Sequence, residues 1–255
     1  MIIRLIMWRY LILFSAVFFM SGCLVEEQCY SSEDCSGECI KGECVSGAGD
    51  VPETRDTIEC PQGMVNIENR YCMDRYEASR SDADSVSYGL KDSIGLSRKN
   101  VLPWFSPSLT YEEASAACSQ AGKRLCTDAE WEWACQNGSS DNVYPYGDVY
   151  EADICNGIDA FCPGEPYPHC FEDYRYQYVF KPVATGDFSE CACREGVYDL
   201  SGNVWEWVTG TRGEENHLRG GAYNCGNSEE LHKCSYKAGD WASAKGFRCC
   251  HDGLE

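Results

Sequence analysis

Two stretches of the chain carry apolar residues at helical spacing after a residue pair that marks a helix start. Thr110 is followed three positions later by Glu113, and Thr127 is followed three positions later by Glu130. After each pair, Ala, Cys or Trp residues recur on one helical face until a turn that contains glycine. A Thr and a Glu at this spacing bond reciprocally to free amide groups at a helix N-terminus, so the pattern predicts a helix after each pair.

Outside these two helices, the apolar residues come in short runs between turn residues. The runs at Gly63–Ile67 and Gly196–Leu200 predict strands, and many Gly, Asn, Asp and Pro residues surround them. Helices and short strands that do not alternate regularly are typical of an α+β domain. We therefore expect a loop-rich α+β fold.

The first 22 residues have the pattern of a secretory signal peptide. Two arginines precede an apolar run from Tyr10 to Met20, and small residues lead to Cys23. The run is shorter than the roughly 20 residues that a membrane-spanning helix needs. Residues 20–23 resemble the lipobox of bacterial lipoproteins, whose Cys carries a lipid after cleavage; a plain signal peptide with a chance Cys is the alternative. We expect lipidation at Cys23 and a membrane anchor in the cell envelope, at the outer membrane or the cell surface.

A small cysteine-rich segment, residues 23–45, follows the signal peptide. Four Cys lie within Cys29–Cys44, with almost nothing apolar between them. Such a segment cannot build a hydrophobic core, so we expect a two-disulfide knot, with a four-thiolate zinc site as the alternative. Residues 46–57 are Gly-rich and acidic, which indicates a linker. The main domain is then residues 58–255.

Composition limits the possible partners and the compartment. The 255-residue chain has a formal charge of -20, and a surface this negative repels phosphate backbones, so we expect no nucleic-acid partner. Its 19 Cys are several times the ordinary usage, which is typical of an oxidising compartment where disulfides persist. The main domain is therefore expected to be stapled by disulfides.

Six motifs in the main domain carry a family resemblance. In chain order they are GMVNIENRYCMDRYEAS, AGKRLCTDAEWEWAC, YPYGD, VYDLSGNVWEW, LRGGAY and GFRCC, from Gly63 to Cys250. Their order, spacing and aromatic placement resemble the formylglycine-generating enzyme family, also called sulfatase-modifying factors. The resemblance implies that family's variant of the C-type-lectin-like fold, with two small sheets, two helices and much irregular structure.

The resemblance also implies a copper site, and here the sequence departs from it. Enzymes of the family hold Cu(I) with two Cys, five positions apart, after an RGGSY-like strand, and oxidise a substrate Cys to formylglycine. Cys225 stands at the first position and Glu230 at the second, while Ala222 replaces the family Ser. A carboxylate is a hard ligand and a poor substitute for thiolate on Cu(I). We expect copper chemistry, with Cys225 as the catalytic residue, only if another thiol supplies the second ligand.

Disulfides are the other possible state of the cysteines. The resemblance implies the pairs Cys118–Cys249 and Cys135–Cys234, and Cys60–Cys72 is the most plausible local pair. The remaining Cys of the main domain are even in number, so Cys225 is either bonded like the others or a free thiol. A bond between Cys249 and its neighbour Cys250 would strain the backbone, so each is expected to bond elsewhere.

A calcium site is the last feature that the resemblance implies. It matches Asp199, the carbonyl groups of Gly202 and Val204, and Glu206, and hard oxygen donors on a tight turn suit calcium. The alternative is that Asp199 and Glu206 only hydrogen-bond within the turn. The resemblance also implies a second calcium site, at Asn156 and Gly157, beside an insertion over residues 158–177.

These features give two functional hypotheses. The first is a lipid-anchored envelope protein whose sulfatase-modifying-factor-like domain lacks the copper Cys pair and acts as a binding or scaffold module for an envelope protein or a glycan. The second is a copper-dependent oxidase that converts Cys to formylglycine in exported proteins. The missing second Cys favours the first hypothesis, and the sequence leaves enzymatic activity undecided.

Overall fold

The computed structural model describes residues 38–40, 43–45, 57–161, 181–211 and 213–254. The chain forms two compact units, Met1–Arg55 and Asp56–Glu255. The expected signal peptide, Cys23 and most of the expected linker lie outside the described residues. None of the helices in the described part is both long and apolar enough to cross a membrane.

In the N-terminal unit the description covers one short hairpin. Strands β1 (Glu38–Ile40) and β2 (Glu43–Val45) pair in antiparallel fashion, and Cys39 stands opposite Cys44 in the register. The structure describes no side chain of this unit. The two-disulfide knot therefore stays a prediction, with the zinc site as its alternative.

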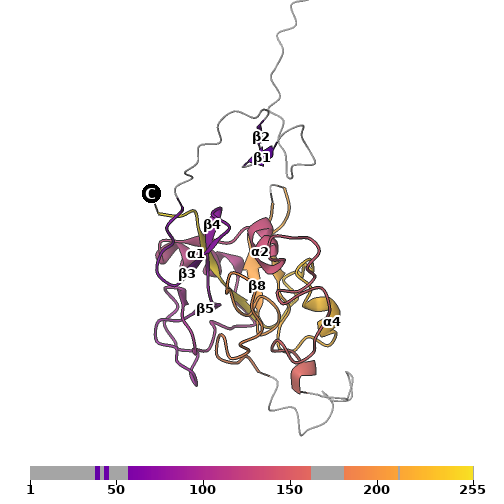
Figure 1. Ribbon diagram of the computed structural model, residues 1–255. Coiled ribbons are helices and arrows are strands. Elements are labelled where there is room, and N and C mark those ends of the chain that lie inside the picture. The colour runs from indigo at the N-terminus through magenta and orange to yellow at the C-terminus, as the bar shows by residue number, and fades with distance from the viewer. Residues whose placement is uncertain (1–37, 41–42, 46–56, 162–180, 212, 255) are drawn as a thin grey trace, which may run out of the picture. The chain divides into compact units, whose positions relative to one another are not determined.

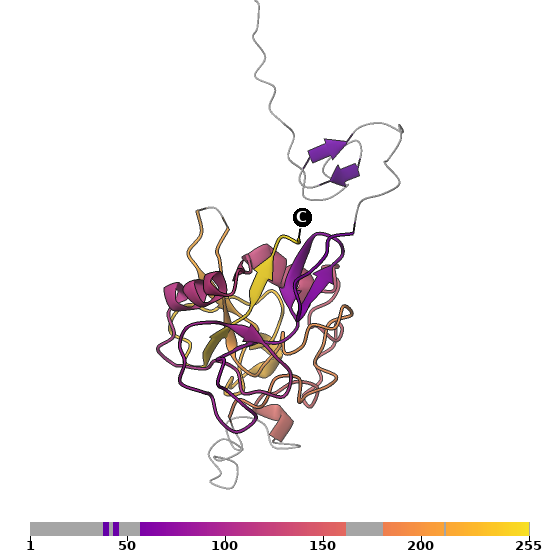
Figure 2. The same ribbon diagram turned by 90° about the vertical axis from the view of Figure 1, so that its left-hand side faces the viewer.

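Two small sheets form the framework of the larger unit (Figures 1 and 2). An antiparallel sheet has the order β3-β4-β11-β7, with bounds Met64–Ile67, Tyr71–Asp74, Cys249–His251 and Arg124–Leu125. A second sheet has the order β10-β8-β9, with bounds Lys245–Phe247, Trp205–Val208 and His217–Arg219. In it, β10 runs parallel to β8, and β9 runs antiparallel. The pair β5 (Ala78–Ser79) and β6 (Leu96–Ser97) completes the strands of the described part.

Both predicted helices are confirmed, together with their capping interactions. They are α1 (Tyr111–Gln120) and α2 (Asp128–Cys135). In α1, Glu113 N donates to Thr110 Oγ1 over 3.2 Å, and Thr110 N donates to the Glu113 carboxylate over 2.9 Å. The reciprocal bonds also form at the start of α2. Two single-turn elements, η1 (Asp159–Phe161) and α4 (Ser228–Leu231), are the other described helices.

The predicted strand at Gly196–Leu200 is wrong, because the segment is irregular and forms no ladder. Gly196 and Asp199 have positive φ angles of 80° and 61°, which interrupt an extended pleat twice within five residues. Tyr198 makes a single bridge to Ala192 and no ladder. The predicted strand at Gly63–Ile67 is confirmed as β3.

Strand β11 directs its two adjacent cysteines to opposite sides. Cys249 bonds to Cys118 of α1 in one hydrophobic cluster, and Cys250 bonds to Cys126 in the other. Alternation of side chains along a strand makes this possible, so neither Cys is forced toward its neighbour. The other disulfides of the described residues are Cys60–Cys72, Cys135–Cys234 and Cys155–Cys191. The three pairs expected from the sequence are among these five.

Candidate functional site

A buried ion pair lies at the centre of the larger unit. Glu206, on β8, accepts bonds from Arg248 on both carboxylate oxygens, each over 2.6 Å. The indole Nε1 of Trp131, on α2, donates to the same carboxylate over 2.7 Å. Arg248 also donates to the carbonyl oxygens of Asp74 and Tyr198, over 3.1 and 2.8 Å. One carboxylate and one guanidinium therefore connect both sheets, a helix and the turn before β8.

Glu77 is a second buried carboxylate and holds the turn that leads into β8. Its carboxylate accepts from the side-chain amide of Asn203 over 2.5 Å and from the backbone N of Val204 over 3.2 Å. Asn203 Oδ1 in turn accepts from Asn156 Nδ2 and from Val183 N, each over 2.9 Å. The Asn203 amide thus uses both ends to join segments that are far apart in the sequence.

Asp199 adds a third buried carboxylate to this region. It accepts from the backbone N of Gly186 over 2.8 Å, and burial raises its pKa to about 7. Burial also raises the pKa of Glu77 well above its usual range, and the nearby carboxylates of Asp199 and Glu206 add to the rise. If all three carboxylates are ionised, Arg248 balances only one of the charges. Burial therefore favours the protonated, neutral forms of Glu77 and Asp199 unless a further cation is present.

Tests of the expected calcium ligands give a divided result. Asp199 fits, because it is a buried oxygen donor close to two other buried carboxylates. Asn156 Oδ1 is buried and has no hydrogen-bond partner, so it offers another oxygen beside the turn. Glu206 fits poorly, because Arg248 and Trp131 already occupy its carboxylate.

Side-chain ligands alone do not make a calcium site here. Within the described part of the chain, no three His, Cys, Asp or Glu side chains gather closely enough to hold a metal ion. A calcium ion would depend on Asp199 together with amide and carbonyl oxygens, including those that the sequence assigns to Gly202 and Val204.

Cys225 is a free thiol enclosed in the hydrophobic cluster around α1. It is 5% exposed, and its Sγ accepts from the backbone N of Ala222 over 3.1 Å. Burial raises the pKa of Cys225 to about 12, so the thiol stays protonated at neutral pH. Copper is bound by the thiolate form of Cys, and the buried environment of Cys225 disfavours that form.

The described residues near Cys225 offer no second soft ligand for copper. Glu230, at the second family position, pairs with Lys233, and its side chain is half exposed. Cys234 is bonded to Cys135. Cys193 is the other free thiol of the described residues, but it belongs to the other hydrophobic cluster. The described residues therefore supply one thiol for copper and no partner thiol.

Comparison with known proteins identifies the family. The family model described as "Sulfatase-modifying factor enzyme 1-like domain" matches residues 41–253. The chain belongs to this sulfatase-modifying factor family. The membership, together with the short strands, few helices and several disulfides, confirms the loop-rich α+β fold expected from the sequence.

Relatives in this family include enzymes and a protein described as inactive. Formylglycine-generating enzyme of Mus musculus is 25% identical over 274 residues, which cover 80% of this chain and 72% of that protein. The enzyme of Streptomyces coelicolor is 28% identical over 174 residues, 56% of this chain and 51% of that one. Inactive C-alpha-formylglycine-generating enzyme 2 of Bos taurus is 34% identical over 101 residues, 39% and 31% of the two chains.

Among solved structures, PvdO from Pseudomonas aeruginosa is similar at 18% identity. The match covers 81% of this chain and 89% of that one, with a TM-score of 0.41.

Two central residues were missed by sequence reasoning about the site. Glu77 and Arg248 both lie in motifs that carry the family resemblance, YCMDRYEAS and GFRCC. A charged residue within an apolar or cysteine-rich motif is a signal of a buried ion pair, but the spacing names no partner. The structure supplies the partners, Asn203 for Glu77 and Glu206 for Arg248.

We predict that Cys193 and Cys225 react with an alkylating reagent only after unfolding, because both thiols are buried. The measurement is alkylation without reductant, in native buffer and in denaturant, followed by peptide mapping. Cysteines of the five disulfides serve as the internal control, since they should react only after reduction. Rapid labelling of Cys225 in the native protein, or its recovery in a disulfide, would contradict the assignment.

We predict that Glu206→Gln lowers the free energy of unfolding by about 3–5 kcal/mol, because Arg248 is left buried without its counter-charge. Denaturant unfolding in excess EDTA measures the effect without any contribution from calcium. The matched control is Asp252→Asn, which removes an exposed partner of Arg124 and should cost less than about 1 kcal/mol. If the two substitutions lowered the free energy of unfolding equally, the buried pair would contribute no more to stability than an exposed ion pair.

Proposed function

We propose that this protein is a lipid-anchored component of the cell envelope whose sulfatase-modifying-factor domain acts as a binding or scaffold module. The single observation that carries the proposal is the state of Cys225, a buried and protonated thiol whose hydrophobic cluster contains no second free thiol among the described residues. The expected lipid anchor at Cys23 and the outer membrane or cell surface as location rest on the sequence. The proposed partner is an envelope protein or a glycan.

Membership of the family is compatible with loss of the oxidase chemistry. The matched relatives include a Bos taurus protein described as inactive, and its aligned segment is 34% identical to this chain. Fold and activity are separable, because chemistry depends on the site and not on the scaffold. The alternative function is a copper-dependent formylglycine-generating oxidase with Cys225 as its surviving ligand, and the free state of Cys225 is the observation in its favour.

We propose further that calcium stabilises the domain at the turn before β8. Three buried carboxylates, on Glu77, Asp199 and Glu206, lie near one arginine, and a divalent cation would favour the ionised forms of Glu77 and Asp199, whose pKa values burial raises. The unpartnered Asn156 Oδ1 supports an oxygen-rich site there. The ion would have a structural role, since calcium prefers oxygen ligands and does not change oxidation state.

For the main proposal we predict that the protein forms no aldehyde in a Cys-x-Pro-x-Arg peptide incubated with Cu(I) and oxygen. The reason is that a lone buried thiol leaves copper without its second soft ligand. Mass spectrometry of the peptide is the measurement, and the Streptomyces coelicolor enzyme is the positive control. Aldehyde formation that disappears in Cys225→Ser would establish the oxidase and overturn the binding-module proposal.

For calcium we predict that millimolar Ca²⁺ raises the melting temperature of the EDTA-treated protein, because an ion that binds only the folded state stabilises it. Asp199→Asn should abolish most of the rise, while Asp252→Asn, which changes an exposed carboxylate, should keep it. Differential scanning calorimetry measures both. An equal response of the Asp199 variant and the unmodified protein would contradict the assignment of this ligand.

A further inference from the structure

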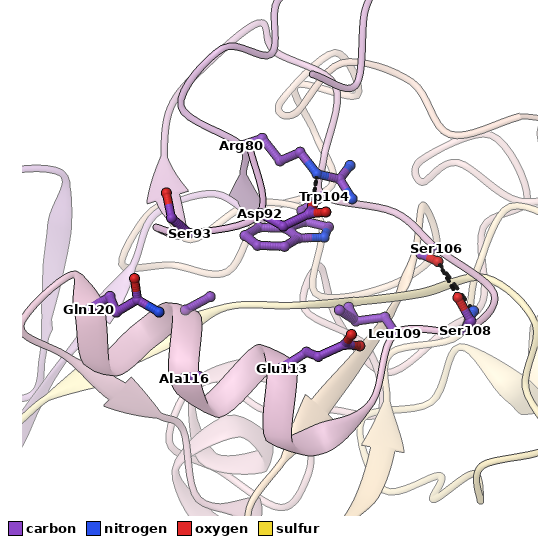
Figure 3. Close-up of a pocket in the computed structure, with 11 residues that line it drawn as sticks. Arg80, Asp92, Ser93, Trp104, Ser106, Ser108, Leu109, Glu113, Ala116 and Gln120 are labelled. Carbon is purple, nitrogen blue, oxygen red and sulfur yellow. Dashed lines mark hydrogen bonds and ion pairs between the residues drawn. The ribbon is translucent and has the colours of Figure 1, made fainter. Parts of the chain in front are cut away.

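A cavity of about 270 Å³ lies between α1 and the segment that carries Trp104 (Figure 3). Its inner part is apolar, formed by Trp104, Leu109 and Ala117, which are buried. Polar side chains line the rest of the cavity, on Arg80, Asp92, Ser93, Ser106, Ser108, Glu113 and Gln120. The buried apolar residues of the cavity belong to the same hydrophobic cluster as Cys225, but neither Cys225 nor the buried carboxylates of Glu77, Asp199 and Glu206 line the cavity. The cavity is therefore separate from the site described above.

Arg80 forms one wall of the cavity and is held in place by three contacts, one of which is a bond from its Nη1 to the Tyr88 carbonyl oxygen over 3.3 Å. Its guanidinium lies over the Trp104 ring, 4.7 Å from the centroid, and its Nε donates to Asp92 over 2.5 Å. Figure 3 shows Trp104 between Arg80 and α1, with Asp92 beside them. Because the guanidinium is paired and stacked, this wall presents planar hydrogen-bonding groups in a fixed orientation.

Helix α1 forms the opposite wall through one face. Glu113, Ala116 and Gln120 lie on this face at helical spacing, with the small Ala116 between the two longer polar side chains (Figure 3). The methyl side chain of Ala116 leaves the cavity open between Glu113 and Gln120. Glu113 is also tied down, since its carboxylate accepts from Thr110 N in the capping box.

We propose that this cavity binds one neutral hexose unit, either as a free sugar or at the end of a glycan. A hexopyranose has an apolar C–H face and a ring of hydroxyl groups, and the cavity has an apolar inner part with donors and acceptors around it. Carboxylate, amide, guanidinium and hydroxyl groups all occur among the lining residues, so a hydroxyl group can both donate and accept. This inference rests on the proposed binding function and names the site and the ligand class.

The charges of the cavity favour a neutral ligand over an ionic one. Arg80 and Asp92 neutralise each other, and the remaining carboxylate, on Glu113, is engaged in capping α1. An anionic ligand would meet Glu113 and the overall negative charge of the chain. A cationic side chain of a protein partner would meet Arg80. A neutral polyol avoids both repulsions and can share the existing hydrogen bonds.

The test is saturation-transfer NMR on the full chain with glucose, galactose, mannose and N-acetylglucosamine, each as the free sugar and as an oligosaccharide. The decisive variant is Ala116→Trp, which fills the cavity from an exposed helix position and should weaken binding at least about tenfold. The matched control is Ser119→Trp, which places the same side chain on an exposed position of α1 outside the lining. It should bind like the unmodified protein.

Each outcome of this test bears on the proposal. Millimolar binding that Ala116→Trp removes and Ser119→Trp keeps supports it, and the free sugars and oligosaccharides then distinguish a single-unit ligand from a glycan end. Absence of binding for every saccharide, or equal binding in both variants, overturns it. Failure here is distinguishable from failure of the proposed function, because only aldehyde formation in the copper assay overturns the latter. A domain with neither activity keeps a protein partner as its proposed ligand.

Discussion

The larger unit depends on the buried pair between Glu206 and Arg248. Removing two charges from water costs several kcal/mol, and the cost is offset only when geometry and further hydrogen bonds are good. Both conditions hold here, because the pair is bidentate and Trp131 and two carbonyl groups complete its bonds. The desolvation cost of the pair is offset only when every segment that supplies one of these hydrogen-bond partners is correctly placed. The pair therefore selects one arrangement of sheets, helix and turn, even though the regular elements are short.

The disulfides determine which metal ligands remain in the interior. Among the described residues of the larger unit, ten cysteines form five disulfides, and the other two lie in different hydrophobic clusters. A soft metal needs at least two thiolates in one place, and this distribution keeps them apart. Hard oxygen atoms, by contrast, gather around the turn before β8, where burial raises the pKa values of Glu77 and Asp199. The proposed calcium ion would therefore meet oxygen ligands, whereas copper would meet a single thiol.

What the sequence could predict follows from how local each feature is. Both helices were predictable, because a capping box is complete within four residues. The turn at Asp199 was not predictable from the sequence. Its positive φ is accompanied by a hydrogen bond from Gly186 N to the Asp199 carboxylate, and the periodicity of apolar residues does not reveal such a contact. The pairs Cys126–Cys250 and Cys155–Cys191 were missed for the same reason, since connectivity is set by the folded arrangement. Cys225 was identified by its position in a motif, but its burial and protonation required the packing around it.

The proposed sugar cavity and the central ion pair are mechanically linked, although they share no residue. Cys118, on the buried side of α1, is bonded to Cys249, the residue after Arg248. The helix that forms one wall of the cavity is thereby tied to the strand that holds the buried arginine. On the other wall, Trp104 packs edge-on against Phe247, the residue before Arg248. Both walls are thus fixed to residues 247–249, through the contact with Phe247 and the disulfide to Cys249. The cavity is therefore formed before a ligand binds. A preformed site loses little conformational entropy on binding, which a small neutral ligand with few contacts requires.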